Sequence, residues 1–325
     1  MPTSHLQFPK HPALELSGIL EGLVHPKSQG DDCIRIYGVR GWIRNRIGNT
    51  SNKQISKELG VSYKNITNWL GNGSREIGIP VEFFIKLCHT YHLNFDEIFH
   101  STRFGCTNSK KYSLPGSLGP DIAYLLGYLM GDGHLANPAD TISNGSNYNA
   151  EIRITTNLVE DLQLLQKIFG SNFSYTPTIY QEHSFYRLVA RAKVLHIFFS
   201  KILNFPVGNK KKATRVPQII LSCPELERWF LMGFFDADGS ICKLSQKYWN
   251  IRIKQFNPKM IQECIRIIKE RGINVSGPYI DKGKRNGTET TSYVLAIQKR
   301  SEIEKFIKEF PSLKILRCEI LAEIK

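Results

Sequence analysis

The chain has 325 residues and a mass of 37.1 kDa, more than one compact domain of usual size, so two or three folded units are expected. Apolar residues at 41% and charged residues at 22% are typical of a globular protein and exclude disorder as the main state. The formal net charge of +14 favours a polyanionic partner, with nucleic acid before an anionic membrane.

The apolar runs do not favour a membrane. The run AYLLGYLM at 123–130 is much shorter than the roughly twenty residues of a spanning helix, and MPTSHLQFPKHP at the start has no signal-peptide core. We therefore expect a cytoplasmic, DNA-associated protein. The seven cysteines are an odd number without C-x-x-C spacing, which indicates reduced, mostly buried thiols instead of disulfides or a zinc finger.

Residues 52–70, NKQISKELGVSYKNITNWL, predict two short helices with a corner at Gly60. The spacing of the apolar residues buries one face of each helix, Gly60 supplies a turn with positive φ, and Ser62 is expected to be the N-cap of the second helix. Such a helix can enter a major groove of DNA. The side chains expected to point outward and contact DNA are Tyr63, Lys64, Asn65 and Asn68.

The following segment IPVEFFIKLCHTYHLNFDEIF, at 79–99, resembles the last helices of Cro/C1-type helix-turn-helix repressor domains. The resemblance covers about residues 35–100 and implies an all-α DNA-binding domain over residues 1–105. A helical hairpin used for packing or protein contacts is the alternative interpretation. Residues 106–119, rich in Gly, Ser, Pro and Lys, lack helical periodicity and are expected to form a linker.

Beyond the linker the chain repeats itself. LLGYLMGDG at 125–133 reappears as LMGFFDADG at 231–239, and the strand-like EIRITT at 151–156 matches NIRIKQ at 250–255. Likewise, YRLVARAK at 186–193 matches YVLAIQKR at 293–300, and a helical segment follows each of these copies. Two pseudo-symmetric α/β halves are therefore expected, one over 120–221 and the other over 222–325.

Each motif is expected to lie at the end of a helix. Proline signals a helix start before each copy, and the final glycine of each motif marks its end. Gly127 and Gly131 are four residues apart, as are Gly233 and Ala237, so each helix has two small residues on one face. Small residues at this spacing let two helix backbones touch, so we expect the motif helices to pack together.

This packing would bring Asp132 and Asp238 side by side at two helix C-termini, an unfavourable meeting of like charges. A divalent cation relieves it, and Mg²⁺ fits because it prefers one or two carboxylates, water and phosphate oxygens. Mn²⁺ is expected to substitute for it. A carboxylate pair with Mg²⁺ beside a polyanionic backbone points to hydrolysis of phosphodiesters. A helix-dimer core with merely solvated acids is the alternative.

The two motifs resemble the signatures of single-chain LAGLIDADG homing endonucleases, and the resemblance covers residues 120–325. It implies a mixed α+β fold of two αββαββα halves that form a saddle on double-stranded DNA, in a monomeric enzyme that cuts both strands. It also implies that Asp132 and Asp238 ligate the metal. The sixth motif position, Asp236 in the second copy and Met130 in the first, is not the essential ligand.

The resemblance assigns further catalytic groups. A polar residue ends the matching strands, which is Gln255 in the second copy and Thr156 in the first. A basic residue follows the last helix of each repeat: Lys210, Lys211 or Lys212 in the first, with Lys211 favoured, and Lys314 or Arg317 in the second, with Lys314 favoured. Such a lysine would polarise water or stabilise the phosphorane.

Alternating strand residues predict one apolar and one basic face for each sheet. A solvated sheet face is the alternative for any one strand. His134 could line the active site, and His89 and His92 have no metal-ligand spacing. The basic residues expected to contact DNA are Arg153, Arg187, Arg191, Arg252 and Lys254.

A second function class is a non-enzymatic binder, which could take two forms. One is a DNA-binding transcription regulator on the same scaffold, whose motif acids would usually be lost, and the other is an RNA maturase, which could keep them. An intein is disfavoured, because the chain starts Met1-Pro2 and ends Glu323-Ile324-Lys325 without the terminal residues that splicing needs.

Overall fold

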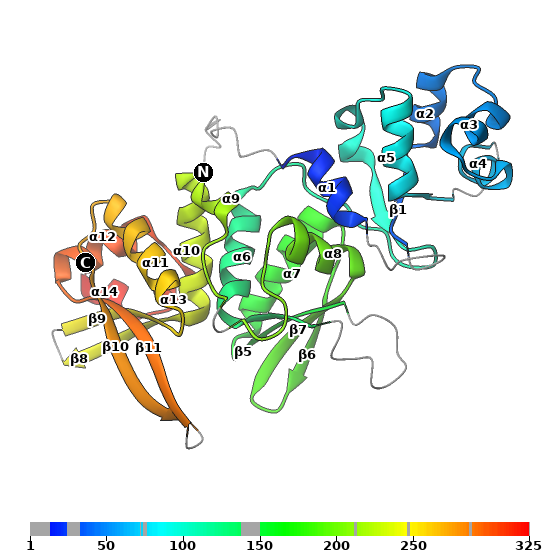
Figure 1. The fold of residues 1–325 in the computed structure, drawn as a ribbon. Helices are drawn as coiled ribbons and strands as arrows, with labels where there is room; N and C mark the ends of the chain where they lie inside the picture. The colour runs from blue at the N-terminus through cyan, green and yellow to red at the C-terminus, as the bar shows by residue number, and fades with distance from the viewer. Residues whose placement is uncertain are drawn as a thin grey trace.

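The computed structural model describes residues 14–24, 33–71, 73, 77–137, 150–210, 213–245, 248–285 and 288–324. Figure 1 shows an elongated arrangement, with α2–α5 at one end, a unit built around α6 and α7 in the middle, and a unit built around α10 and α11 at the other end. The mixed α and β class expected from the sequence is confirmed.

The described residues between 14 and 105 form a mainly helical unit with a small sheet. Its elements are α1 (Leu16–Leu23), β1 (Arg35–Tyr37), α2 (Arg40–Ile47), α3 (Asn52–Leu59), α4 (Tyr63–Leu70), β2 (Ile79–Pro80), α5 (Val81–Thr90), η2 (Phe95–Glu97), η3 (Phe99–Ser101) and β3 (Arg103–Gly105). The strands pair antiparallel in the order β2-β1-β3. The prediction of an all-α domain is therefore wrong. Strands of two or three residues are too short to produce a period-two pattern that sequence reading could detect.

The α3-turn-α4 segment has the local geometry that its residues predict. Gly60 lies between the helices with φ of 65°, and the hydroxyl of Ser62 accepts a hydrogen bond from Asn65 N as the N-cap of α4. Ile66 and Trp69 are buried on the inner face of α4. The opposite face of α4 is consequently exposed to solvent.

The segment before α6 packs against the middle unit. Within it Tyr112, Leu114 and Leu118 are buried, and Ser113 N donates a 3.1 Å hydrogen bond to Phe173 O. The helix α1 contacts both α5 and η5, so it joins the N-terminal domain to the middle unit. Residues 106–119 therefore take part in the apolar core, although their sequence is typical of a linker.

The middle unit is an α–β–β–α–β–β–α succession with additional helical turns. Its elements are α6 (Pro120–Asp132), β4 (Gly133–Leu135), β5 (Glu151–Thr156), α7 (Val159–Phe173), β6 (Thr178–Glu182), β7 (Phe185–Arg191), α8 (Lys193–Ile197), η5 (Phe198–Ile202) and α9 (Gln218–Leu221). The strands form an antiparallel sheet in the order β4-β5-β7-β6.

The C-terminal unit has the same succession. Its elements are α10 (Pro224–Asp238), β8 (Gly239–Ser245), β9 (Tyr248–Gln255), α11 (Pro258–Glu270), β10 (Ser276–Arg285), β11 (Thr288–Ile297), α12 (Arg300–Glu309), α13 (Leu313–Leu316) and α14 (Ile320–Ile324). The strand order β10-β11-β9-β8 corresponds strand for strand to that of the middle unit. In Figure 1 both sheets lie along the lower side of the molecule, with the helices above them.

Helices α6 and α10 pack with their backbones in contact. A Cβ atom added at Gly127 would lie 2.0 Å from Phe230 O, and one added at Gly233 would lie 2.0 Å from Tyr124 O. A Cβ atom at Gly131 would lie 2.4 Å from that of Ala237. The prediction that small residues bring the motif helices together is confirmed, because no larger side chain fits between them.

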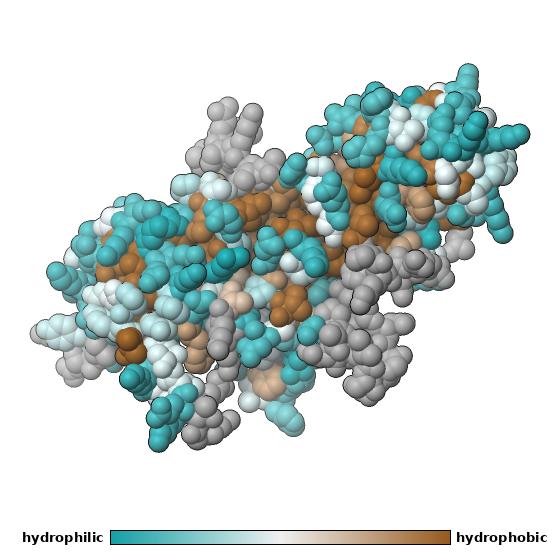
Figure 2. Space-filling view, in the orientation of Figure 1, coloured by the Kyte–Doolittle hydropathy of each residue, from teal (hydrophilic) through white to brown (hydrophobic). Residues whose placement is uncertain are grey.

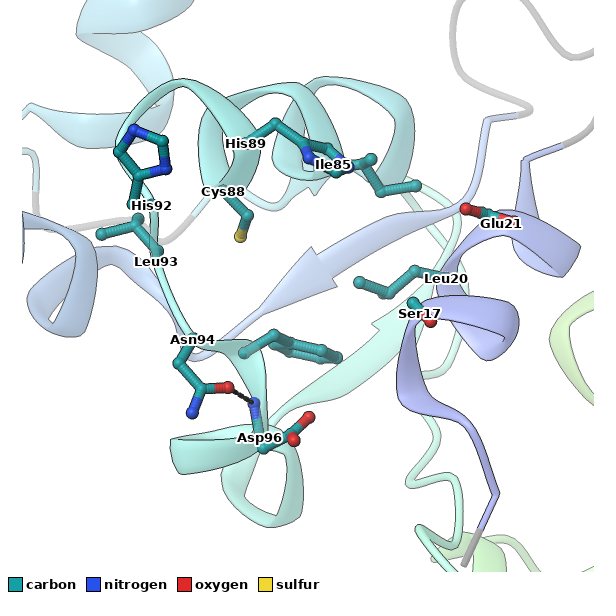
Figure 3. A pocket seen from close by; sticks show the side chains of 11 residues that line it. Ser17, Leu20, Glu21, Ile85, Cys88, His89, His92, Leu93, Asn94 and Asp96 are labelled. Carbon is teal, nitrogen blue, oxygen red and sulfur yellow. Dashed lines mark hydrogen bonds between the residues drawn. The ribbon is translucent and has the colours of Figure 1, made fainter.

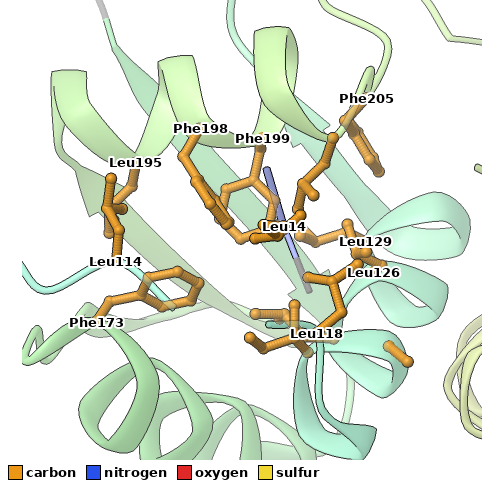
Figure 4. Packing of buried hydrophobic residues seen from close by; sticks show 14 of the residues in the cluster. Leu14, Leu114, Leu118, Leu126, Leu129, Phe173, Leu195, Phe198, Phe199 and Phe205 are labelled. Atoms are coloured by element: carbon orange, nitrogen blue, oxygen red, sulfur yellow. The ribbon is translucent and has the colours of Figure 1, made fainter. Parts of the chain in front are cut away.

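A continuous apolar core surrounds these helices. The side chains in Figure 4 show how α6, α7, α8 and η5 supply apolar groups to one cluster, together with the chain before α1 and α6. The labelled residues are Leu14, Leu114, Leu118, Leu126, Leu129, Phe173, Leu195, Phe198, Phe199 and Phe205. All of them are buried, which fixes α6 against the sheet of the middle unit.

On the face shown in Figure 2, hydrophobic residues gather mainly along the middle of the molecule, and hydrophilic residues cover most of the rim. No helix within the described ranges is long and apolar enough to cross a membrane. All seven cysteines are free thiols as expected, but Cys264 alone is buried, so the expectation of mostly buried thiols is wrong.

The packing of α6 on α10 predicts a large effect for Gly233→Ala. The added methyl group would overlap Tyr124 O, and backbone cannot move away as a flexible side chain can. We expect the free energy of unfolding to fall by about 3 kcal/mol or more, measured by urea denaturation. The matched control is Gly170→Ala in α7, where a Cβ atom would meet nothing within 4 Å. Equal losses for the two variants would contradict the close approach.

Candidate active site

The two motif aspartates lie where α6 and α10 end side by side. Asp132 is the last residue of α6, and Asp238 is the last residue of α10. Asp238 Oδ2 lies only 3.1 Å from the position that a Cβ atom would occupy at Gly131, the residue before Asp132. Asp132 is exposed and Asp238 is partly exposed, so both carboxylates remain open to a ligand.

The surroundings of these carboxylates disfavour their negative charge. Burial, followed by the neighbouring Asp132, raises the pKa of Asp238 to about 6, although Lys210 and Lys314 oppose this shift. Crowding by protein atoms also raises the pKa of Asp132 above its usual range, even though its side chain keeps access to solvent. Burial is the main physical cause of both shifts, and for Asp238 the like charge of Asp132 at the neighbouring helix C-terminus adds to it.

One lysine from each unit lies beside the aspartates. Lys210 Nζ donates to Leu129 O at 2.8 Å and to Gly131 O at 2.5 Å, at the end of α6. Burial lowers the pKa of Lys210 to about 8, although the two aspartates favour its charged form. Lys211, the residue that the sequence favours, lies outside the described residues. The structure thus brings Lys210 to the aspartates.

Lys314 has the corresponding position in the C-terminal unit. Its Nζ donates to Ala237 O at 3.1 Å and to Gly239 O at 2.6 Å, at the end of α10. Burial lowers the pKa of Lys314, while Asp236, Asp132 and Asp238 oppose the shift. Both lysines therefore donate to backbone carbonyl groups at or next to a helix C-terminus.

The polar residues at the strand ends differ between the two units. Gln255 is buried at the end of β9, and its Nε2 donates a hydrogen bond to Asp238 Oδ2. The corresponding residue of β5, Thr156, hydrogen-bonds with Tyr128, a residue of α6. His134 is exposed at the start of the sheet, opposite Arg153 in the strand register.

A buried polar network that sequence reading missed connects the units. Asp161 of α7 is 3% exposed, accepts a 3.0 Å hydrogen bond from Tyr128 Oη and forms an ion pair with Arg317. Asp236 of α10 is also 3% exposed and accepts a 2.8 Å hydrogen bond from Tyr124 Oη. Asp236 therefore hydrogen-bonds with protein groups, and that it is not the essential ligand stays a prediction.

Within the described ranges, Asp132 and Asp238 are the acids that the C-terminal ends of α6 and α10 offer to a metal. Among the described residues, no group of three or more His, Cys, Asp or Glu side chains could hold a metal ion. The pair nonetheless fits Mg²⁺, which takes one or two protein carboxylates and completes its shell with water and phosphate. Burial and, after it, the charge of Asp132 raise the pKa of Asp238, and a bound cation would offset both effects.

The predicted basic faces exist, but most of their cations have acidic partners. Arg153, Arg187 and Arg191 share one face of the middle sheet, opposite buried Ile152 and Ile154. The buried carboxylate of Glu151 pairs with Arg153 and, at 3.2 Å, with Arg191; Glu182 pairs with Arg187 at 2.5 Å. Arg252 and Lys254 share a face in the C-terminal sheet, where Asp281 pairs with Lys254 at 2.6 Å.

The four polar residues predicted on the second helix of the N-terminal pair are all exposed on α4. Tyr63 is 57% exposed, although large aromatic side chains are usually buried. Whether they contact DNA stays a prediction.

A cavity of about 350 Å³ lies apart from this site, between α1, α5 and η2 (Figure 3). The side chains of Leu20, Ile85 and Leu93 line it together with polar groups such as Asn94 and Asp96. None of its lining residues belongs to α6 or α10, so it does not extend the aspartate site.

The sequence of the C-terminal unit matches a known family. Residues 225–311, from α10 through α12, match the family model of the LAGLIDADG-like domain. This segment contains Asp238 and Gln255, so the resemblance read from the motif is confirmed there. The Cro/C1 resemblance of the N-terminal domain stays a prediction.

Curated relatives are much longer than this chain. The glutamine–fructose-6-phosphate aminotransferase of Methanocaldococcus jannaschii is 25% identical over 284 residues, which are 83% of this chain and 24% of that protein. The tRNA-splicing ligase RtcB of Pyrococcus furiosus is 26% identical over 202 residues, which are 57% of this chain and 20% of that protein. The chain thus matches about a quarter of these relatives or less.

Among solved structures, the homing endonuclease I-DmoI in complex with DNA and Ca is similar to this chain. The sequence identity is 22%, the TM-score is 0.45, and the match covers 63% of this chain and 96% of the other.

The raised pKa of Asp238 predicts a pH-dependent effect of Asp238→Asn. An acid with a higher pKa in the folded than in the unfolded protein destabilises the fold when it is charged. This cost is absent below the unfolded value of about 3.9 and complete above about 6. We expect Asp238→Asn to raise the melting temperature of metal-free protein at pH 8 and to change it far less at pH 4.

The control is Asp281→Asn, because a hydrogen bond from Lys254 lowers the pKa of Asp281. That variant should not gain stability at pH 8. A loss of stability at pH 8 in Asp238→Asn would contradict the assigned cost of charging Asp238 in the folded protein.

Proposed function

We propose that this protein is a site-specific DNA endonuclease that hydrolyses one phosphodiester bond on each strand of a long, near-palindromic site and uses Mg²⁺. The observation that carries the proposal is the meeting of Asp132 and Asp238 at the ends of two close-packed helices. A merely structural helix pair has no reason to concentrate two acids there, because their repulsion and the helix dipoles disfavour it.

The chemistry of the site supports phosphodiester hydrolysis. A Mg²⁺ ion held by Asp132 and Asp238 would activate water and neutralise charge on the leaving oxygen. Lys210 and Lys314 each donate two of three ammonium hydrogens to backbone carbonyls, which would leave the third for a phosphate oxygen or a water molecule. Gln255 orients the carboxylate of Asp238.

The two units act as pseudo-symmetric halves of a monomer in this proposal. Their identical succession of elements and their matching strand orders support it. The basic faces of the two sheets would follow the DNA backbone, with Arg153, Arg187 and Arg191 on one half-site and Arg252 and Lys254 on the other. The C-terminal match to the LAGLIDADG-like domain agrees with this arrangement.

The N-terminal domain would add contacts on one flank of the site. The exposed face of α4, the N-cap at Ser62 and the turn at Gly60 support a helix-turn-helix that places Tyr63 and Lys64 in a major groove.

Two substitutions test the catalytic proposal directly. Asp132→Asn and Asp238→Asn keep the side-chain volume but remove the charge, so each should slow cleavage in Mg²⁺ by about a hundredfold or more. Binding measured in Ca²⁺ should stay almost unchanged, because phosphate contacts carry most of the affinity. The DNA substrate for these assays is identified by selecting the sites that the wild-type protein cleaves in a randomised DNA library.

Asp121→Asn is the matched control, since Asp121 is an exposed acid at the opposite end of α6. Wild-type turnover by either aspartate variant would contradict the roles of these acids. Tight binding by the wild-type protein without nicking in Mg²⁺ would instead favour a regulator.

Lys64→Ala tests the role of α4. Loss of one phosphate contact should weaken binding and reduce the slope of log affinity against log salt by about one. Cleavage at saturating protein should not change. Lys167→Ala, at an exposed lysine of α7, is the control. An unchanged salt slope in Lys64→Ala would show that this helix face does not contact the DNA backbone.

A further inference from the structure

The short helix that carries Lys314 needs external support. The helix α13 has four residues, Leu313–Leu316, which is about one turn. A single turn has almost no stability of its own, because forming the first hydrogen bond orders several residues at once. The position of Lys314 beside the aspartates therefore depends on what holds α13 at its two ends.

The first end of α13 is held by Asp236. Its carboxylate accepts hydrogen bonds from Leu313 N at 3.0 Å and from Lys314 N at 2.7 Å. The same carboxylate accepts the 2.8 Å hydrogen bond from the hydroxyl of Tyr124. Tyr124 belongs to α6 of the middle unit, so a residue of one unit orients the acid that holds the lysine-bearing helix of the other.

The second end of α13 is held from the middle unit directly. Arg317, the C-cap of α13, pairs with Asp161 of α7. Asp161 is buried and also accepts the hydrogen bond from Tyr128 Oη, which fixes its orientation. A buried acid without its cation carries a large desolvation cost, so this pair strongly favours one position of Arg317.

Lys210 has a different local support. The residue of α6 that corresponds to Asp236 is Met130, which has no carboxylate to accept backbone hydrogen bonds. Lys210 O instead accepts hydrogen bonds from Ala213 N at 2.8 Å and Thr214 N at 2.9 Å, within its own turn. The two lysines, which are equivalent in chemistry, are thus held by unlike structures.

We infer that Tyr124 and Asp161 of the middle unit are positioning residues for Lys314, and that they set the rate at which the C-terminal unit cuts its own DNA strand. This inference rests on the proposed endonuclease function. Neither residue touches DNA in this scheme. They act through Asp236 and Arg317 on α13, so the cleavage of one strand depends on the folded state of the opposite unit.

Asp161→Asn and Tyr124→Phe test the inference, because both keep the side-chain shape and remove one link. A small displacement of a catalytic group can slow a reaction by about a hundredfold, so one strand should be cut about tenfold to a hundredfold more slowly. The other strand should keep its rate. End-labelled duplex identifies the slow strand, and nicked plasmid should accumulate before linear product.

A double variant and a control sharpen the result. The double variant Arg317→Gln/Asp161→Asn should slow the same strand no more than either change alone, because the two changes remove the same ion pair. Glu227→Gln is the control, since Glu227 is equally buried and pairs with Arg266 away from α13. It should leave both strands with wild-type rates. Equal slowing of both strands in Asp161→Asn would overturn the inference.

A second readout does not need cleavage. The rate of acetylation of Lys314 by acetic anhydride, followed by mass spectrometry, should rise several-fold in Asp161→Asn and Tyr124→Phe, while Lys210 keeps its wild-type rate. Unchanged labelling of Lys314 in both variants would overturn the inference, even with a slower strand. A wild-type protein that cuts no selected DNA would refute the proposed function, while this labelling would still decide whether α13 is held as described.

Discussion

The close approach of α6 and α10 is the constraint on which the rest of the site depends. At Gly127 and Gly233 a backbone oxygen of one helix occupies the space of the missing side chain of the other. Helices packed this tightly end at nearly the same place, and both end in an aspartate. The two aspartates are adjacent because the helix backbones touch at these glycines, and not because the acids attract each other.

This arrangement places four sources of negative potential together, namely two carboxylates and two helix C-termini. The lysines interact with the helix ends as well as with the acids, because each ammonium group donates hydrogen bonds to two backbone carbonyls. They therefore neutralise the helix ends while leaving the carboxylates partly open. Burial, followed by the neighbouring Asp132, keeps the pKa of Asp238 raised although both lysines oppose the shift.

The sequence predicted the parts of this structure that depend on local pattern. The segment EIRITT coincides with β5, and the small residues of the two motifs face each other as their spacing requires. The motif acids could be predicted for the same reason, because a helix followed by glycine fixes its last residue. The short strands β1 and β2 were beyond prediction, since two or three residues show no period.

The network around α13 shows why other site residues could not be predicted. Asp161 lies in the first turn of a helix, where an acid is common because of the helix dipole. Only the fold shows that it is buried against Arg317, which is distant in the chain. Lys210 stands in a run of three lysines, and nothing local distinguishes them. Lys210 lies at the site because the carbonyl groups of Leu129 and Gly131 are placed where its Nζ can donate to them.

The ion pairs on the sheet faces affect how strongly a protein with a net charge of +14 attracts a polyanion. Glu151, Glu182 and Asp281 each pair with cations that would otherwise attract any polyanion. Nonspecific affinity depends on the number of cations free to replace counterions, so these acids reduce it. Under the proposed function, a phosphate must compete with a carboxylate for Arg153, Arg187 and Arg191. Under the proposed function, these acids would therefore lower nonspecific affinity and increase discrimination between DNA sites.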